Sequence, residues 1–345
     1  MKIQLSTTAI FIVVLACLLI DANLKNFEKQ DRVIEWDVHS YYAYLPAVFI
    51  YNDIKLVKSD YRFGNSYYLF WPSTTAEGKN VIKTSMGIAI LYAPFFFVAE
   101  TIAVLTDYPE TGFSEPYKIF LLLSAVFYLF VGLDYLKKTL RHFKFSDIHT
   151  AITILLIGLG TNLLCYSSQS APMSHVYSFC LISIFIYYTI RWHEFQTIKH
   201  TLIIGFLIGL ISLIRPTNVI VMLIFVFYGI SNVSDLKDRF LFFRKKTPLL
   251  LLMLILFILV WMPQFIYWKI VTGHFFYYSY TGERFFFNDP KIIDGIFSFR
   301  KGWLVYTPIM AFALIGIFLL KDSVKKMQFP IIIFFVINIY IRYII

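Results

Sequence analysis

Asp37 begins a short segment in which an acidic side chain is followed at once by aromatic residues. The sequence from residue 35 reads Glu-Trp-Asp-Val-His-Ser and continues into Tyr-Tyr-Ala-Tyr-Leu-Pro at residues 41–46. A carboxylate can accept a proton from a hydroxyl or an amine, and nearby aromatic rings would raise its pKa by removing water. Asp is also a common N-cap, so Asp37 could instead cap a helix over residues 39–49. Asp37 is therefore a candidate general base, with helix capping as the structural alternative.

Three side chains in and after this segment have types suited to holding a ligand. His39 and Tyr42 stand close behind Asp37, and Lys83 immediately precedes an apolar stretch. A lysine ammonium can pair with a phosphate, although lysines beside apolar stretches more often extend along the membrane surface to reach water. A single histidine among tyrosines is more often a hydrogen-bonded structural residue than a ligand or a base. Structural roles therefore compete with ligand binding at His39 and Lys83.

Two cationic residues further along the chain stand beside apolar stretches. His175 follows Ser174 at the start of the stretch 176–190, and Arg215 is followed by Pro-Thr-Asn between two short apolar segments. An arginine between membrane spans is energetically costly and usually marks a functional site or a specific ion pair. The N-terminus of the helix that follows would also favour an anion beside it. We expect His175 and Arg215 to face the same side as Asp37, with Arg215 close to a phosphate of a ligand.

A third candidate group is formed by Tyr280, Glu283 and Arg284 within the run Tyr-Tyr-Ser-Tyr-Thr-Gly-Glu-Arg-Phe at residues 277–285. Aromatic residues alone would indicate an interfacial belt, whereas an acid and an arginine among them suggest a loop that faces a ligand. The three cysteines lie in separate apolar runs, and no Cys/His cluster with zinc-ligand spacing is present. No cofactor is therefore indicated with certainty, and the use of a divalent metal stays open.

The composition identifies the class of protein that carries these residues. Of 345 residues, 59% are hydrophobic and 15% are charged, whereas soluble domains are about 45–50% apolar and about 25% charged. The 37 phenylalanines and 24 tyrosines also exclude a disordered chain. Apolar runs of membrane-spanning length recur along the sequence. The sequence therefore predicts a polytopic membrane protein with the lipid bilayer as its partner.

The apolar stretches predict nine membrane-spanning helices in one all-α bundle. They cover residues 7–20, 119–136, 148–165, 176–190, 201–214, 219–230, 249–268, 303–320 and 329–345. A further apolar stretch, residues 86–105, contains Pro94 and Glu100, and we expect it to lie at the external interface without crossing. Residues 22–116 then form a large first external loop with interfacial helices, and residues 269–302 form a late external loop.

The distribution of lysine and arginine supports this topology, with the N-terminus in the cytoplasm. Short cytoplasmic loops carry an excess of these residues. If residues 86–105 do not cross, the four cytoplasmic loops hold 14 of them, and the short external turns hold one. If that stretch crossed, every later loop would invert and the basic loops would face outward. Orientation therefore accounts for the net charge of +10, and nucleic acid is not an expected partner.

The whole of residues 1–345 is expected to form a single membrane domain. The first apolar run continues past Cys17 without a typical cleavage site, which favours an uncleaved first helix over a signal peptide. Gly205 and Gly209 are four residues apart, a spacing that suits close packing of one membrane helix on another. The last apolar run reaches Ile345 without a polar tail, so we expect the natural protein to continue beyond this residue.

Taken in order, these motifs resemble those of the GT-C superfamily of integral-membrane glycosyltransferases. The resemblance is to bacterial members of family 39, the protein mannosyltransferase and aminoarabinose transferase type. Asp37 with the aromatic run at 41–46 is similar to the first-loop motif of that family, and Lys83-Thr-Ser-Met-Gly is similar to its lysine element before an interfacial helix. Ser174-His175, the Arg215-Pro-Thr-Asn turn and residues 298–308 are similar to patterns in bacterial members.

The resemblance implies a helical bundle with interfacial helices in the first external loop, and it also implies an activity. That activity is the transfer of a sugar from a polyprenyl-phosphate donor to a glycan, lipid or protein acceptor by inverting direct displacement. Asp37 would deprotonate the acceptor, while Lys83 and Arg215 would stabilise the leaving lipid phosphate. The active site would face outward from a bacterial inner (plasma) membrane.

Other functions compete with this interpretation. A transporter or lipid flippase would place ionisable residues near the middle of the bilayer, often in two related halves, yet the predicted spans carry little charge and no repeat is visible. A non-catalytic membrane scaffold would tolerate loss of the Asp37 carboxylate, whereas a transferase would not. An O-antigen ligase or polymerase has a similar architecture, with key basic residues in a late external loop such as residues 272–308.

Overall fold

The computed structural model of the chain is built almost entirely of helices, which confirms the predicted all-α class. It describes residues 4–58, 62–63, 67–232, 234–280, 286–300 and 302–343, with the backbone alone for residues 62–63 and 67–68. The α-helices are α1 (Leu5–Leu24), α2 (Asp37–Tyr42), α3 (Tyr44–Phe49), α4 (Gly87–Leu105), α5 (Glu115–His142), α6 (Asp147–Gly160), α7 (Leu163–Ser167), α8 (Ser174–Glu194), α9 (Ile198–Ile214), α10 (Met222–Phe227), α11 (Asp235–Lys245), α12 (Thr247–Thr272), α13 (Ile292–Phe297), α14 (Trp303–Tyr306), α15 (Met310–Phe318) and α16 (Gln328–Tyr343). Short 3-10 helices are η1 (Asn26–Glu28), η2 (Pro216–Val221) and η3 (Asp322–Met327).

Several of these helices are long and apolar enough to cross a membrane, so the chain is a multi-pass membrane protein. Within the described residues, five segments meet this condition: α1, α4, α5, α12 and the continuous segment Asp322–Tyr343. The shorter apolar segments are α6, α9 and Pro216–Phe227. Nine spans therefore remain a prediction.

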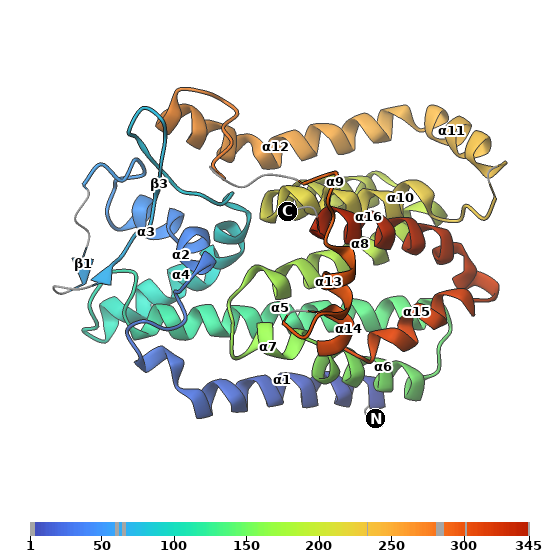
Figure 1. Ribbon diagram of the computed structural model, residues 1–345, viewed down its shortest axis with the longest axis horizontal. Coiled ribbons are helices and arrows are strands. Elements are labelled where there is room, and N and C mark those ends of the chain that lie inside the picture. Colours follow the sequence, from blue (N-terminus) through green and yellow to red (C-terminus); the bar gives the residue numbers. More distant parts are fainter. Residues whose placement is uncertain are drawn as a thin grey trace.

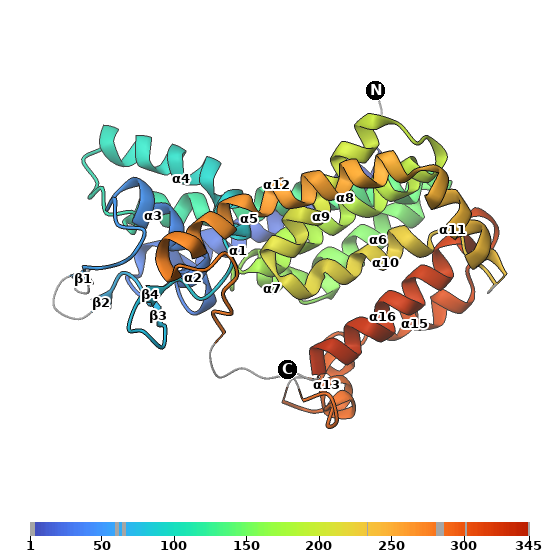
Figure 2. The ribbon, with the colours of Figure 1, turned by 90° about the horizontal axis from the view of Figure 1, so that it is seen from above.

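The long helices pack side by side in the order α6, α1, α5, α8, α9 and α12 (Figure 1). Helices α2 and α3 gather at one end of this bundle with four short strands, and we call this the loop end. Helix α11 lies at the opposite end, where α10 and α16 run beside one another (Figures 1 and 2). The polar and aromatic first loop is thereby concentrated at one end of an apolar bundle.

The short strands order the loop between α3 and α4. Strand β1 (Arg62–Phe63) pairs antiparallel with β2 (Tyr67–Tyr68), and β3 (Ser73–Thr74) pairs antiparallel with β4 (Asn80–Val81). In the second pair Ser73 lies opposite Val81. This pairing brings the chain back to the bundle directly before Lys83.

Two of the predicted spans are interrupted. Residues 303–320 form α14 and α15, which are separated at Thr307-Pro308, because proline lacks an N–H and disfavours helical backbone in the residue before it. The predicted span 148–165 is divided into α6 and α7 at Thr161, whose backbone is extended. The segment after Arg215 likewise begins as the 3-10 helix η2, with a proline at its first position.

Helix α4 packs along the first part of α5, at the loop end. The Tyr128 hydroxyl of α5 donates to the carbonyl of Leu91 at 3.2 Å, and the Tyr117 hydroxyl donates to the Glu100 carboxylate. A Cβ on Gly87, the first residue of α4, would lie 2.4 Å from the backbone nitrogen of Ile214, the last residue of α9. Residues 91 and 100 of α4 thus contact residues 128 and 117 of α5, so the two helices run antiparallel. Since α4 is itself long and apolar enough to cross a membrane, its non-crossing placement stays a prediction.

The predicted close packing around Gly205 and Gly209 is confirmed, and the partner helix is α12. A Cβ on Gly205 would lie 2.8 Å from the Cα of Met253, and one on Gly209 would lie 2.8 Å from the Cβ of Val260. Small residues let membrane helices approach to this distance. Helix α9 is thereby fixed between α8 and α12, and so is the arginine that follows it.

Gly205→Ala is expected to destabilise the bundle, whereas the control substitution Gly316→Ala is not. The added Cβ at residue 205 would press on backbone atoms of Met253, which cannot rotate away, but nothing lies within 4 Å of a Cβ at Gly316. Overpacking costs about 1–3 kcal/mol, while alanine in an open helical position gains up to about 1 kcal/mol over glycine. Thermal unfolding of both variants in the same detergent checks this. Equal midpoints would contradict the close contact of α9 with α12.

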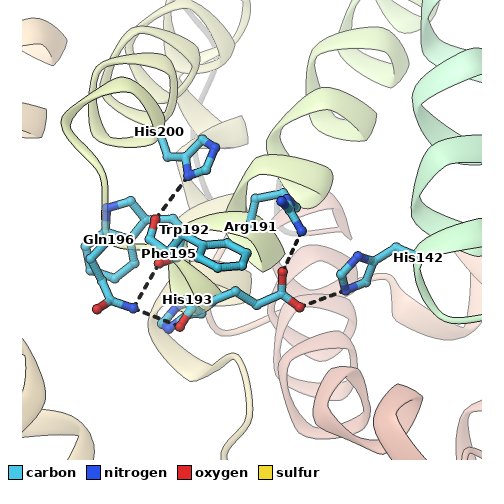
Figure 3. Close-up of polar contacts among 8 residues, drawn as sticks. His142, Arg191, Trp192, His193, Phe195, Gln196 and His200 are labelled. Carbon is cyan, nitrogen blue, oxygen red and sulfur yellow. Dashed lines mark hydrogen bonds and ion pairs between the residues drawn. The ribbon is translucent and has the colours of Figure 1, made fainter.

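The end of α8 farthest from the loop end is fixed by polar contacts (Figure 3). The Glu194 carboxylate accepts a hydrogen bond from Arg191 at 2.9 Å and lies 3.0 Å from the His142 ring at the end of α5. Gln196 donates to the carbonyl of His193 at 2.9 Å, which satisfies a backbone acceptor of the last turn. These contacts fix α8 against α5. They thereby also help to place the N-terminal end of α8, which begins at Ser174.

Candidate functional site

Asp37 lies at the loop end as the first residue of α2. The N-cap of α2 is Trp36, and no side chain makes a capping hydrogen bond there, so the capping alternative for Asp37 is wrong. The Asp37 side chain is exposed, and its Oδ2 accepts a hydrogen bond from the Tyr41 hydroxyl at 3.5 Å. This contact is at the long limit for a hydrogen bond. The carboxylate therefore keeps the capacity to accept a proton from a bound molecule.

The backbone just before Asp37 is strained. Trp36 has a φ of 50° and a ψ of −131°, in the left-handed range that favours glycine. Its side chain is 73% exposed, so no packing of the indole accounts for this conformation. Strained residues persist where the surroundings determine them, and they cluster at ligand-binding sites. Seven other non-glycine residues among those described also have a positive φ, Val33 and Leu56 of the same loop included, so this conformation does not by itself mark Asp37 as functional.

Arg215 reaches the same place from the end of α9. Its Nη2 donates to the Tyr41 hydroxyl at 3.2 Å, and its Nε donates to Ser174 Oγ, on the first residue of α8, at 3.0 Å. The Tyr41 hydroxyl also lies 3.4 Å from Ser174 Oγ. Arg215 and Asp37 are close enough for their charges to attract. Three segments far apart in the sequence therefore place a carboxylate and a guanidinium on either side of one tyrosine hydroxyl.

Lys83 lies in a segment that is tied to the bundle on several sides. The Tyr44 hydroxyl donates to the carbonyl of Thr84 at 2.6 Å, and Ser85 Oγ donates to the carbonyl of Leu213 at 2.7 Å. The backbone nitrogen of residue 86 donates to Gln264 Oε1 at 2.8 Å. The backbone around Lys83 is thus fixed to α3, α9 and α12.

Tyr280 joins the lysine to the arginine. The ammonium of Lys83 lies 5.4 Å from the centre of the Tyr280 ring, and Ser279 Oγ donates to the carbonyl of Lys83. Arg215 also interacts electrostatically with Tyr280. The structure therefore brings together four of the residues that the sequence selected, Asp37, Lys83, Arg215 and Tyr280.

Two other selected residues are structural elements of the first loop. Tyr42 is fully buried and donates to the carbonyl of Gly112 at 2.5 Å, so its predicted contact with substrate is wrong: neighbouring helical residues point in different directions, and Tyr41 faces the site instead. His39 is buried and stacks on Trp71 with ring centres 4.3 Å apart. Burial lowers the pKa of His39 to about 4, so it is uncharged at neutral pH and supplies no positive charge for an anion.

His175 and a residue that the sequence analysis did not select lie beside Arg215. His175 stacks on Tyr166 at 3.8 Å between ring centres, and it lines a cavity of about 220 Å³ together with Arg215 and Arg342. Arg342 is in the last turn of α16. An arginine within an apolar run is itself a signal of function, and this signal could have identified Arg342.

An apolar groove of about 630 Å³ opens between α3, α4 and α12. Its lining includes Tyr44, Val48, Ile90, Ala93, Pro263 and Ile266. It also includes Met86, three residues after Lys83, so the groove reaches the segment that carries the lysine. The shape and lining suit an extended hydrocarbon chain whose polar end lies near that cation.

Glu283 and Arg284 lie outside the described residues. In the part of the chain that the structure describes, no three His, Cys, Asp or Glu side chains gather closely enough to hold a metal ion. The chain matches no family model, and no curated protein or solved structure matches it.

Proposed function

We propose that this protein is a membrane glycosyltransferase of the GT-C type, similar to bacterial family 39, which takes a sugar from a polyprenyl-phosphate donor. The observation that carries the proposal is the arrangement of Asp37 and Arg215 around the Tyr41 hydroxyl. A carboxylate can accept a proton from an acceptor, and a fixed guanidinium can stabilise an anionic leaving group. Direct sugar transfer from a lipid phosphate needs one group of each kind.

The proposed reaction is a single displacement. The acceptor hydroxyl or amine gives its proton to the Asp37 carboxylate, and its oxygen or nitrogen forms a bond to the anomeric carbon. The bond from that carbon to the phosphate oxygen breaks, and the electron pair leaves with the polyprenyl phosphate. Lys83 and Arg215 stabilise the negative charge of the departing phosphate. Attack opposite the leaving group inverts the anomeric configuration.

The groove between α3, α4 and α12 supports a lipid-linked donor. Its lining is mostly apolar and includes Met86, three residues after Lys83, which suits a molecule with a hydrocarbon tail and a phosphate at its end. The tail of such a donor is already out of water in the bilayer, so the groove would position the phosphate near Lys83 by packing against the tail. A soluble nucleotide-sugar donor would make no use of such a groove.

The same proposal gives the protein an orientation. With the N-terminus in the cytoplasm and nine spans, the loop end faces outward from a bacterial inner membrane, and α11 faces the cytoplasm. Helix α11 and residue 246 after it include five lysines and arginines over residues 237–246, which fits the positive-inside rule. Acceptors would therefore be glycans, lipids or proteins on the outer side.

The test of the proposal is sugar transfer by membranes that contain the protein, with a panel of radiolabelled polyprenyl-phosphate sugars. A transferase releases free polyprenyl phosphate together with a labelled acceptor. A flippase moves the intact lipid-linked sugar across the bilayer and releases no polyprenyl phosphate. Absence of released polyprenyl phosphate across the panel, with intact donor moved to the other leaflet, would overturn the proposal in favour of transport.

Ala93→Trp is expected to raise the KM for a long-chain donor roughly 10-fold, which corresponds to about 1.4 kcal/mol of lost packing between tail and groove. Ala93 lines the apolar groove, so the indole would occupy space that the proposed tail needs. A short-chain donor analogue should be affected much less. Val98→Trp is the matched control, since Val98 is on α4 but outside the groove lining and is 46% exposed. An equal KM change in both variants would contradict lipid binding in this groove.

A further inference from the structure

The polar cavity that His175 lines with Arg215 and Arg342 lies between the start of α8, the 3-10 helix η2 and the end of α16. Its volume is about 220 Å³, enough for a phosphate or a diphosphate, and none of its lining residues is acidic. Its polar lining consists of Ser174, His175, Ser178, Arg215, Asn218, Asn338 and Arg342. The lining therefore offers many hydrogen-bond donors and two fixed positive charges.

The two arginines face the cavity without a carboxylate between them. Arg215 and Arg342 are close enough for their charges to repel each other. Neither forms an ion pair with an acid among the described residues, and the hydrogen bonds of Arg215 go to hydroxyl groups. Two like charges beside an apolar bundle are costly unless an opposite charge lies between them. Arg215 has the Asp37 carboxylate nearby, whereas no acid in the described part of the chain acts on Arg342, so an anion bound in the cavity would offset the repulsion between the two arginines.

The N-terminus of α8 adds to the positive electrostatic potential of the cavity. Helix α8 has 21 residues, its N-cap Met173 makes no side-chain capping hydrogen bond, and its first residues Ser174 and His175 line the cavity. The N-terminal end of a helix carries partial positive charge and unpaired N–H groups. Two guanidinium groups and a helix N-terminus thus converge on one enclosed space.

The cavity is open to ligands from one side. A larger cavity of about 590 Å³ adjoins it and shares His175, Phe179, Phe334, Asn338 and Arg342. The larger cavity is mostly lined by aromatic and aliphatic residues, including Tyr166 and Trp303. Arg342 itself is exposed, so an anion can reach it. A polar pocket with an amphipathic entrance suits a phosphate attached to a larger molecule as well as free phosphate.

We propose that this cavity is a phosphate-binding site formed by Arg215 and Arg342 with Asn218, Asn338 and the first turn of α8. It shares Arg215 with the position proposed for the donor phosphate, whereas Lys83 is not part of its lining and Arg342, Asn218 and Asn338 are. The phosphate is either free inorganic phosphate or diphosphate, or the phosphomonoester headgroup of a lipid. Through Arg215 the site adjoins the proposed transferase site, but binding of free phosphate by it can be measured without any sugar transfer.

The test measures binding of inorganic diphosphate to the full chain in detergent by isothermal titration calorimetry. Arg342→Gln is expected to weaken binding roughly 10-fold or more, as loss of a charge-assisted hydrogen bond would. Arg244→Gln, at an exposed position of α11, is the matched control and should bind as the wild type does.

A second arm identifies the source of the phosphate. The same proteins are titrated with phosphatidic acid in mixed micelles, and phosphatidylcholine serves as the lipid without a phosphomonoester. Displacement of diphosphate by phosphatidic acid alone would identify a lipid headgroup, and no displacement would identify free phosphate. Equal binding of either probe by wild type and Arg342→Gln, with equal unfolding temperatures, would overturn the site, as would no binding of either probe to the wild type.

Discussion

Asp37→Asn is expected to lower the rate of sugar transfer by about 10²–10⁴-fold, the usual contribution of a general base. Asparagine keeps the size of the side chain and can still contact Tyr41, but it cannot take up a proton at neutral pH. The fold should be unaffected, because Asp37 is exposed and makes no cap hydrogen bond. The measurement is the initial rate of transfer from a polyprenyl-phosphate sugar in membranes with matched expression.

Glu35→Gln is the matched control for this substitution. Glu35 belongs to the same segment and pairs with Arg32 at 3.4 Å, so it tests the general effect of removing a nearby negative charge. Its transfer rate should remain within about 2-fold of wild type, since exposed ion pairs contribute little. If Asp37→Asn transferred sugar as fast as Glu35→Gln, Asp37 would not be the base.

Arg215→Met is expected to lower kcat by about 10²–10³-fold, as the loss of one fixed donor to a developing negative charge does. The guanidinium is held by Ser174 and Tyr41 through two of its nitrogens, so it is positioned before the substrate binds. Arg215→Lys keeps the charge but not the planar arrangement of donors. We therefore expect the lysine variant to recover only part of the lost rate.

The ratio of effects on kcat and KM separates catalysis from simple binding at Arg215. An interaction made chiefly with the departing phosphate lowers kcat, whereas one made equally with bound donor raises KM alone. The control Arg244→Gln should change neither constant. A rise in KM with unchanged kcat would show that Arg215 binds the donor and does not stabilise its departure. Thermal unfolding of Arg215→Met excludes loss of structure as the cause.

Much of the helical framework could be predicted from the sequence because apolar runs between charged loops define it. The predicted stretch 119–136 lies within α5, and 249–268 lies within α12. The interruption at Thr307-Pro308 was missed, although proline gives a local signal for it. The shortness of α10 could not be predicted, since 3-10 and α-helical turns present the same apolar pattern.

The site was predictable in part. Asp37, Lys83 and Arg215 were selected by residue type and by position beside apolar stretches, and these signals are local. The roles of Tyr41 and Tyr42 could not be separated from the sequence. The two residues are of the same type and differ only in the face of the helix on which each side chain lies. The partnership of Arg215 with Tyr41 spans 174 residues, and that of Arg215 with Arg342 depends on how α16 packs. Such contacts are set by tertiary packing.

The exposed indole of Trp36 also bears on the depth at which the Asp37 carboxylate lies relative to a membrane. Tryptophan side chains concentrate where lipid headgroups meet water, because the ring is apolar and its N–H is polar. An indole that projects from the loop end, directly before Asp37, would anchor this segment at the interface between headgroups and water. The carboxylate would then lie at the level of the lipid phosphates, where a donor presents its sugar. It would stay above the hydrocarbon, where an unpaired charge is energetically costly.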